Sequence, residues 1–95
     1  KQIRSHYPQA HIFLGLGPMI SDEHPQGGQR LTHARAYLEA VVAALSTGGD
    51  KRVTLVQFPT QDGSRGWGCD WHPSLATHAA MAAQLTDTLK TTLGW

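Results

Sequence analysis

Cysteine is nearly absent from this chain: Cys69 is the only one among 95 residues. A single thiol excludes a disulfide within the chain and any zinc site that needs two or more cysteines. Cys69 remains able to pair with another chain, although we expect a small, partly buried thiol. The six histidines do not replace the missing cysteines, because none stands in an H-x-H or H-x-x-x-H arrangement. We therefore predict no metal site.

Strongly charged stretches and long apolar runs are also missing. The formal net charge is +1 at pH 7, and the chain has neither a basic stripe nor an acidic tail. This balance gives no reason to expect nucleic acid or anionic lipid as a partner. The apolar runs are far shorter than the roughly 18 residues of a membrane span. With 40% hydrophobic residues, the chain reads as one small globular domain at most.

Two segments have the character of strands. Ile12, Phe13 and Leu14 form a short apolar run that begins after Pro8 and ends at a glycine-rich turn. Such a run is typical of a buried parallel strand. The segment 52–58, RVTLVQF, is rich in β-branched residues and predicts a second strand.

Two segments have the character of helices. Residues 31–46 repeat apolar side chains every three or four positions, and Gly48 and Gly49 end this helix. Ser74 is the expected N-cap of the last helix. We expect the inner faces of the two helices, together with the loop residue Met19, to supply core residues: Ala34, Tyr37, Leu38, Val41, Val42 and Leu45, and then His78, Met81, Ala82, Leu85, Leu89 and Leu93.

The order strand, helix, strand, helix predicts an α/β fold with a parallel sheet and helices on its faces. Two strands are few for such a sheet, which needs neighbours and cover on both sides. We therefore expect residues 1–95 to be the C-terminal segment of a larger domain. The remaining strands would come from a separate chain, a nicked partner or a homo-oligomer. The alternative is a complete small α/β protein, which would be a stable monomer by itself.

The stretch GCDWHPS, residues 68–74, lies in the loop after the second strand. Ligands of open α/β sheets bind beyond the carboxyl ends of the strands, and this loop lies at that end. A histidine at this edge with a carboxylate two residues before it is where a general base is expected. His72 and Asp70 are therefore candidates for a catalytic pair. The alternatives are a loop histidine that only hydrogen-bonds a neighbour, and an Asx-turn carboxylate that starts the last helix.

These residues resemble a known family. GCDWHPSLATHAAMAAQLTDTLKTTLGW is similar to the C-terminal block of the SGNH (GDSL-type) hydrolases, and most of all to the acetyl xylan esterases of carbohydrate esterase family two. YPQAHIFLGLGPM resembles the penultimate strand region of the same enzymes. The resemblance implies a three-layer α/β/α, flavodoxin-like domain that hydrolyses acetyl esters on sugars without a cofactor. Family habit also implies a secreted or periplasmic enzyme.

The resemblance assigns roles to two residues. His72 matches the catalytic histidine, which takes the proton from a serine nucleophile, and Asp70 matches the acid that orients it. In the wider superfamily that acid usually stands three residues before the histidine, where this chain has Cys69. Some family-two enzymes use a backbone carbonyl instead, and Cys69 or Asp70 can supply one here.

The chain lacks the other parts that the family requires. None of its serines lies in a Gly-Asp-Ser motif, and it has no asparagine for the usual oxyanion hole. We therefore expect an N-terminal segment or chain to bring the nucleophile, and no efficient hydrolysis without it.

Trp67 and Trp71 are candidates for lining the acyl or sugar pocket, and a hydrophobic lid over the core is the other interpretation. The rival function is a non-catalytic carbohydrate-binding or assembly module, in which these two tryptophans are stacking platforms and the His–Asp pair is vestigial.

Overall fold

The computed structural model describes all 95 residues, Lys1–Trp95. Its elements are α1 (Gln2–His6), β1 (Ile12–Leu16), α2 (Arg30–Thr47), β2 (Val53–Gln57), the short 3₁₀ turn η1 (Cys69–Trp71) and α3 (Leu75–Leu93). The expected order of strand, helix, strand and helix is confirmed, with α1 as a short additional helix before it. None of the helices has the length and apolar character that crossing a membrane requires.

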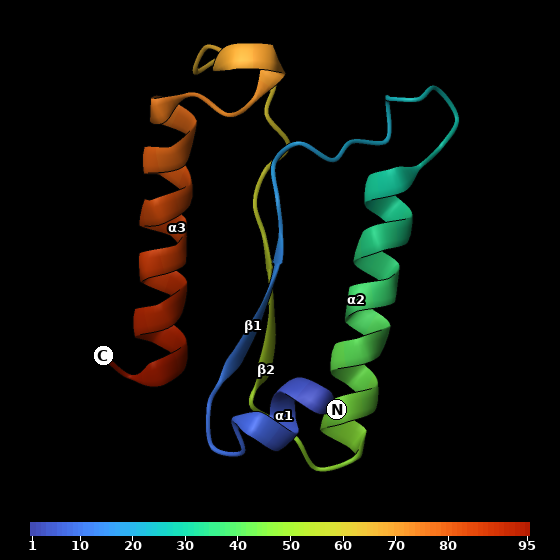
Figure 1. Ribbon diagram of the computed structural model, residues 1–95, viewed down its shortest axis with the longest axis vertical. Helices are drawn as coiled ribbons and strands as arrows, with labels where there is room; N and C mark the ends of the chain where they lie inside the picture. The colour runs from blue at the N-terminus through green and yellow to red at the C-terminus, as the bar shows by residue number, and fades with distance from the viewer.

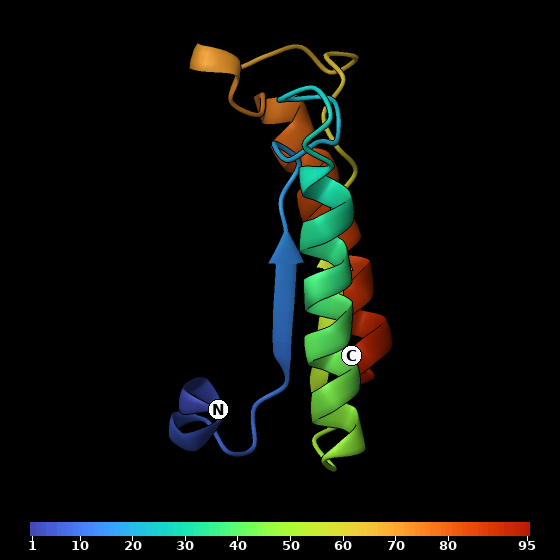
Figure 2. The ribbon, with the colours of Figure 1, turned by 90° about the vertical axis from the view of Figure 1, so that its right-hand side faces the viewer.

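The two strands form a parallel sheet in which Ile12 is paired with Val53 and Leu16 with Gln57. The strands lie between α2 and α3, which flank opposite faces of the sheet (Figure 1). This confirms the predicted α/β class with helices on both faces of a parallel sheet. Seen from the side, α2 and α3 lie beside β2, whereas β1 stands beyond them at the margin of the molecule (Figure 2). Each strand is paired along one edge only.

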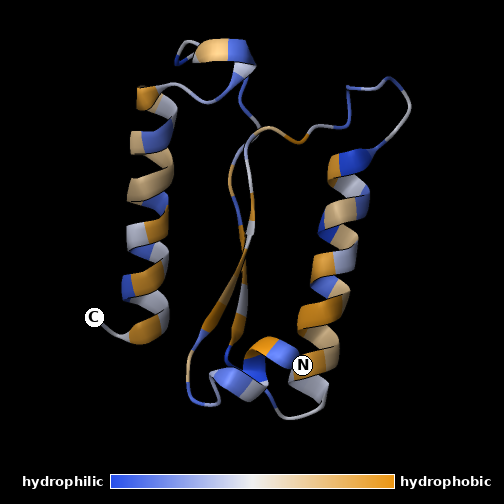
Figure 3. Cartoon of the chain, viewed as in Figure 1, coloured by the Kyte–Doolittle hydropathy of each residue, from blue (hydrophilic) through white to orange (hydrophobic).

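The buried core is thin and lies on the strands and just beyond them. Its apolar members are Leu16, Val53, Val56 and Phe58, each at most 9% exposed. Apolar residues gather along both strands and on the C-terminal half of α2 (Figure 3). Only 6 of the 95 residues are buried, so much of the apolar surface of the sheet is only partly covered.

Helix α2 packs on the sheet through a narrower stripe than the sequence predicts. Tyr37 is 74% exposed and Val41 is 46% exposed, so the expectation that both belong to the core was wrong. They lie at the sides of a stripe whose half-buried members recur at steps of three and four residues. These members are Leu31, Ala34, Leu38, Val42 and Leu45.

Helix α3 turns a partly polar face inward. Thr77 in its first turn is buried, and Gln84 donates a hydrogen bond from its side-chain amide to the carbonyl oxygen of Gln57, over 2.8 Å. The inner face of α3 thus includes Gln84, which contacts the end of β2, whereas His78 and Ala82 are exposed. Their expected burial was wrong, because the apolar pattern takes no account of polar side chains that satisfy strand ends. Met81, Leu85, Leu89 and Leu93 are half-buried.

The loop after β1 fixes the start of α2. The helix begins after Gln29, which has a left-handed backbone and no side-chain cap. The carboxylate of Asp22 takes over that task and accepts hydrogen bonds from the amide and the hydroxyl of Thr32. These bonds, led by the one from the hydroxyl, lower the pKa of Asp22 and satisfy a helix donor that would otherwise lack a partner. Met19 in the same loop is 52% exposed, so its predicted place in the core was wrong.

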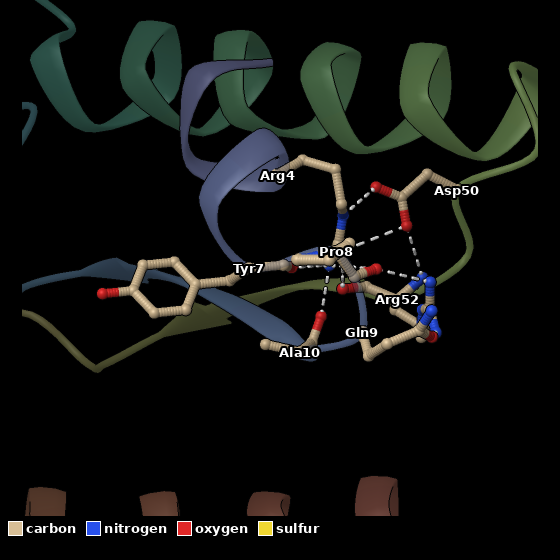
Figure 4. A network of polar contacts seen from close by, with 7 residues as sticks. All are labelled: Arg4, Tyr7, Pro8, Gln9, Ala10, Asp50 and Arg52. Atoms are coloured by element: carbon tan, nitrogen blue, oxygen red, sulfur yellow. Dashed lines mark hydrogen bonds and ion pairs between the residues drawn. The ribbon is translucent and has the colours of Figure 1, made fainter.

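Arg4 ties α1 to the amino end of the sheet (Figure 4). Its guanidinium binds both carboxylate oxygens of Asp50, at 2.8 and 3.1 Å. It also donates to the carbonyl oxygen of Arg52 at the entrance to β2, and to those of Tyr7 and Ala10 in the turn before β1. A single planar cation with five donors thus joins three segments, at the opposite end of the strands from the loops that follow them (Figure 1).

Candidate functional site

The loop between β2 and α3 lies at the carboxyl end of the sheet. The loop after β1 opens on the same end, and the turn η1 stands above both strands (Figure 1). A backbone bond from the amide of Gln61 to the carbonyl oxygen of Pro18, 2.9 Å long, joins the two loops. The segment GCDWHPS therefore stands where the rule for open α/β sheets locates ligands.

The backbone of this segment is tightly turned. Asp70 and Trp71 are consecutive non-glycine residues with left-handed φ angles of 53° and 62°. Such conformations cost on the order of 1–3 kcal/mol each and persist only when the surrounding structure enforces them. Here the amide of Gly68 donates to the carbonyl oxygen of His72 over 2.7 Å, and the amide of His72 donates to that of Cys69 over 3.0 Å. Both bonds close the turn on itself.

The backbone of the turn leaves little room for a side chain at Gly68. A Cβ atom at this position would stand 3.0 Å from the carbonyl oxygens of both His72 and Pro73. Those oxygens belong to the backbone of the turn and cannot move aside as a flexible side chain would. A side chain at position 68 would therefore need a small shift of the turn that follows it.

The imidazole of His72 is held by peptide carbonyls. Its Nδ1 atom lies 2.9 Å from the carbonyl oxygen of Cys69 and 3.1 Å from that of Asp70. Carbonyl oxygens only accept hydrogen bonds, so Nδ1 carries the proton of the neutral ring. The Nε2 atom is then the unprotonated nitrogen, and the side chain is exposed. An oriented imidazole with a free, accessible Nε2 is the arrangement that a general base requires.

The side chain of Asp70 has no hydrogen bond with this ring; the residue meets the imidazole through its carbonyl oxygen. Cys69 acts in the same way, and its thiol is exposed, so the expectation of a partly buried thiol was wrong. The geometry thus brings His72 and Asp70 together as the sequence predicts, but through the main chain. The left-handed conformation of Asp70 turns its carbonyl toward the ring.

Trp67 and Trp71 lie next to each other, one on each side of Cys69 and Asp70 in the sequence. Their ring centroids are 5.5 Å apart and the planes meet at 74°, an edge-to-face contact. Trp67 is 44% exposed and Trp71 is 68% exposed. Trp67 rests on Gly63, where a Cβ would come within 2.9 Å of its indole ring. The pair forms an exposed aromatic surface beside His72 rather than a cover over the core.

Two side chains outside the segment 68–72, those of Ser74 and Gln61, hydrogen-bond to backbone carbonyl oxygens of this loop. Ser74 caps α3 by accepting from the amide of Thr77, and its hydroxyl donates to the carbonyl oxygen of Arg65 over 2.7 Å. Gln61 donates from its side-chain amide to the carbonyl oxygen of Trp71 over 2.6 Å. Sequence reasoning identified Ser74 as a cap but missed Gln61. A glutamine in an irregular loop has no periodic or motif signal that reveals it.

The other groups that the chemistry of an esterase needs are not on this surface. No serine hydroxyl of the chain hydrogen-bonds the His72 ring, whose partners are the two carbonyl oxygens. No group of three or more histidine, cysteine, aspartate or glutamate side chains is placed to hold a metal ion. The carboxylate of Asp62 is engaged by Ser64 through hydrogen bonds that lower its pKa.

Known esterases resemble this chain over nearly its whole length. No family model matches the chain. Over 94 residues it is 47% identical to the cellulase/esterase CelE of Acetivibrio thermocellus; this covers 99% of the chain but 11% of CelE. A family two carbohydrate esterase from Clostridium thermocellum, solved in complex with cellohexaose, superposes with a TM-score of 0.89 at 47% identity.

A carbohydrate esterase family 2 enzyme with a carbohydrate binding domain, from Corynascus thermopiles (Myceliophthora fergusii), superposes with a TM-score of 0.77 at 37% identity. Each solved relative covers 99% of this chain, and the chain spans 27% of each. The chain thus spans about a quarter of the solved relatives and about a tenth of CelE. The resemblance noted in the sequence is confirmed: over nearly its whole length this chain is homologous, in sequence and in fold, to part of the family two carbohydrate esterases.

Proposed function

We propose that this chain supplies the catalytic histidine of an SGNH-type serine esterase that removes acetyl groups from carbohydrate esters. The observation that carries the proposal is the orientation of His72. Two peptide carbonyls accept from its Nδ1 and leave its exposed Nε2 as a base at the carboxyl end of the sheet. The homology to carbohydrate esterases supports the reaction class.

The nucleophile is proposed to come from an N-terminal segment of the same domain or from a separate chain. β1 pairs with β2 along one edge, and its other edge has no strand beside it. This free edge supports the proposal of a further segment, since a parallel sheet is completed by further strands. On this view residues 1–95 are the C-terminal segment of one SGNH domain. We extend the proposal to acetylated xylan as a substrate and, by family habit, to a secreted or periplasmic location.

The chemistry follows from the tautomer of the ring. Nε2 of His72 accepts the proton of the serine hydroxyl while the serine oxygen attacks the acetyl carbonyl carbon. The imidazolium that forms keeps both nitrogens protonated, and the carbonyl oxygens of Cys69 and Asp70 stabilise the proton on Nδ1. The proton on Nε2 then passes to the departing sugar oxygen. In the second half the oxygen of a water molecule attacks the acetyl carbon of the acyl-serine while Nε2 of His72 takes one of its protons. The bond from that carbon to the serine oxygen then breaks and the Nε2 proton passes to the serine oxygen, which releases acetic acid and restores the serine.

The direct test replaces His72 by alanine in the assembled esterase, meaning this chain together with the nucleophile-bearing segment. We expect turnover of an acetylated chromogenic ester to fall by at least about 10²- to 10⁴-fold, the share of acid–base catalysis alone. His78→Ala is the matched control, because His78 is exposed on α3 and should leave turnover unchanged. Undiminished turnover by His72→Ala would end the catalytic proposal.

A second candidate, a carbohydrate-binding module, is favoured by the exposed Trp67–Trp71 pair. The solved complex of a homologous esterase with cellohexaose also favours it. Aromatic faces of this kind stack on sugar rings. The two candidates separate in one experiment. If the wild-type assembly binds oligosaccharide but shows no turnover of any acetylated ester, the module is the better account.

A further inference from the structure

Gln61 connects the turn that carries His72 to the end of β1. Its backbone amide donates to the carbonyl oxygen of Pro18 over 2.9 Å, and its side-chain amide donates to the carbonyl oxygen of Trp71 over 2.6 Å. We propose that Gln61 is a positioning residue that fixes the direction of the His72 imidazole through the peptide group before it. This inference rests on the proposed function, in which His72 is the general base.

The contact acts on the peptide plane that decides where the ring points. The carbonyl of Trp71 belongs to the peptide that enters His72, so a bond to its oxygen fixes ψ of Trp71 and φ of His72 together. Rotation of this plane would swing the Cα–Cβ bond of His72. The Nδ1 atom would then leave the carbonyl oxygens of Cys69 and Asp70, which it meets at 2.9 and 3.1 Å.

The other hydrogen bonds of the turn cannot hold the peptide between Trp71 and His72 in place relative to the sheet. The bonds between Gly68 and His72 and between His72 and Cys69 begin and end inside the turn, so they move with it. The left-handed Asp70 and Trp71 favour a return to ordinary backbone angles. Gln61 opposes that return from outside the turn, because its own backbone is bonded to Pro18 in the loop that follows β1.

The oxygen of the same side-chain amide shows that the position of Gln61 is not the one that would stabilise the fold most. The Oε1 atom of Gln61 is buried and has no hydrogen-bond partner, in the wall of a polar hollow between the loop 59–65 and α3. A buried acceptor without a partner is unfavourable. Turning the amide over would not help, because Oε1 would then face the carbonyl oxygen of Trp71. The amide is thus oriented by the need to donate to Trp71.

The test compares Gln61→Leu with Gln84→Leu in the assembled esterase. Gln84 is the matched control, because it also donates from its side-chain amide to a backbone oxygen, that of Gln57 over 2.8 Å, and lines the same hollow. It does not touch the His72 turn. The readouts are kcat and KM on an acetylated chromogenic ester and the ¹⁵N shifts of the His72 ring, which report which nitrogen carries the proton.

We expect Gln61→Leu to lower kcat about tenfold, the effect of about one hydrogen bond, with KM within about twofold. The His72 ring should change from the Nδ1–H form to a mixture of both tautomers. Gln84→Leu should leave kcat and the ring shifts unchanged. If Gln61→Leu does not fold, Gln61→Glu keeps the shape and loses the donor, and it should show the same kcat loss at neutral pH.

Unchanged ring shifts and unchanged kcat in both Gln61 variants would overturn the inference while the role of His72 stands. Equal kcat losses in the Gln61 and Gln84 variants would also overturn it, because they would indicate general destabilisation. If His72→Ala keeps full turnover, the proposed function fails instead. The ring shifts of Gln61→Leu then still decide whether Gln61 positions His72.

Discussion

The Nδ1 atom of His72 and the carbonyl oxygen of Cys69 lie 2.9 Å apart, so a peptide group occupies the place that a carboxylate takes in a Ser-His-Asp triad. A peptide oxygen fixes the tautomer as well as a carboxylate does, because either one can only accept from Nδ1–H. It differs in carrying no full negative charge to stabilise the imidazolium. The peptide oxygen therefore orients the imidazole but stabilises the imidazolium less than a carboxylate would.

Asp70→Asn separates the two ways in which residue 70 can act. Its carboxylate makes no bond to the ring, and asparagine tolerates the left-handed backbone that aims the carbonyl. We expect the assembled esterase to keep kcat within about threefold, less than 1 kcal/mol in the barrier. Steady-state kinetics on an acetylated ester measure it. Asp87→Asn, an exposed charge change on α3, is the control.

The opposite result is equally clear for Asp70. If its carboxylate orients the ring during turnover, the same substitution should lower kcat on the order of 10⁴-fold, as loss of the orienting acid does in a Ser-His-Asp triad. A loss of that size would show that the side chain turns toward the imidazole when the nucleophile-bearing segment is in place.

Gly68→Ala should damage the site through the backbone. The added Cβ would stand 3.0 Å from the carbonyl oxygens of His72 and Pro73, so the turn must give by a few tenths of an ångström and move the imidazole with it. Since a misplacement of about 1 Å can lower the rate on the order of 10²-fold, we expect this smaller shift to lower kcat by up to about tenfold. Gly48→Ala is the control, since its Cβ makes ordinary contacts of 3.4 Å or more at the end of α2. Equal activity of the two variants would contradict the packing argument.

The sequence was sufficient for the fold class, and it led to a candidate region for the site. Apolar runs and glycine boundaries placed both strands, and the rule for the carboxyl ends of parallel strands pointed to the loop that holds His72. The sequence did not allow us to predict the contacts made by polar side chains. Gln84 bonds to a strand end and lies on the inner face of α3, while Gln61 reaches ten residues along the chain to Trp71. Hydrophobic periodicity carries no information about such bonds.

The backbone of Asp70 was the other feature that sequence reasoning missed. The spacing of Asp70 and His72 suggested a side-chain pair, and the structure joins them through a carbonyl instead. Left-handed backbone angles at two consecutive non-glycine residues are imposed by the surrounding contacts and have no local signature. The family resemblance, by contrast, did raise the possibility of a backbone carbonyl.

The two tryptophans should differ in what they do. Trp71 is 68% exposed and its recorded ring contact is with Trp67, which itself rests on Gly63. If the chain acts as the carbohydrate-binding module of the second proposal, Trp71→Ala should weaken binding of a cellohexaose probe about tenfold, or 1.4 kcal/mol, with little change in Tm, because its side chain is largely exposed. Trp67→Ala should lower Tm as well, since it removes packing. Titration calorimetry and thermal unfolding measure both. Unchanged affinity in Trp71→Ala would assign the aromatic surface to another contact.

The ion pair between Arg4 and Asp50 predicts a pH dependence of stability. Hydrogen bonds from Arg4, and then from the amide of Arg52, hold the pKa of Asp50 below its ordinary value. An aspartate whose pKa is lowered on folding stabilises the folded state above the unfolded-state pKa of about 3.9. That stabilisation disappears as the pH falls through the lower folded-state value. Asp50→Asn should therefore have a lower Tm than the wild type at pH 7.

The difference in Tm should be constant from pH 7 to about pH 5 and then shrink toward zero below about pH 4, because the wild-type carboxyl becomes neutral like the amide. Thermal unfolding followed across this range measures it. Asp87→Asn is again the control: it should differ little from the wild type at any pH, since Asp87 is exposed on α3. A difference for Asp50→Asn that persists undiminished at pH 2 would mean that the bonds to Arg4 do not depend on the charge.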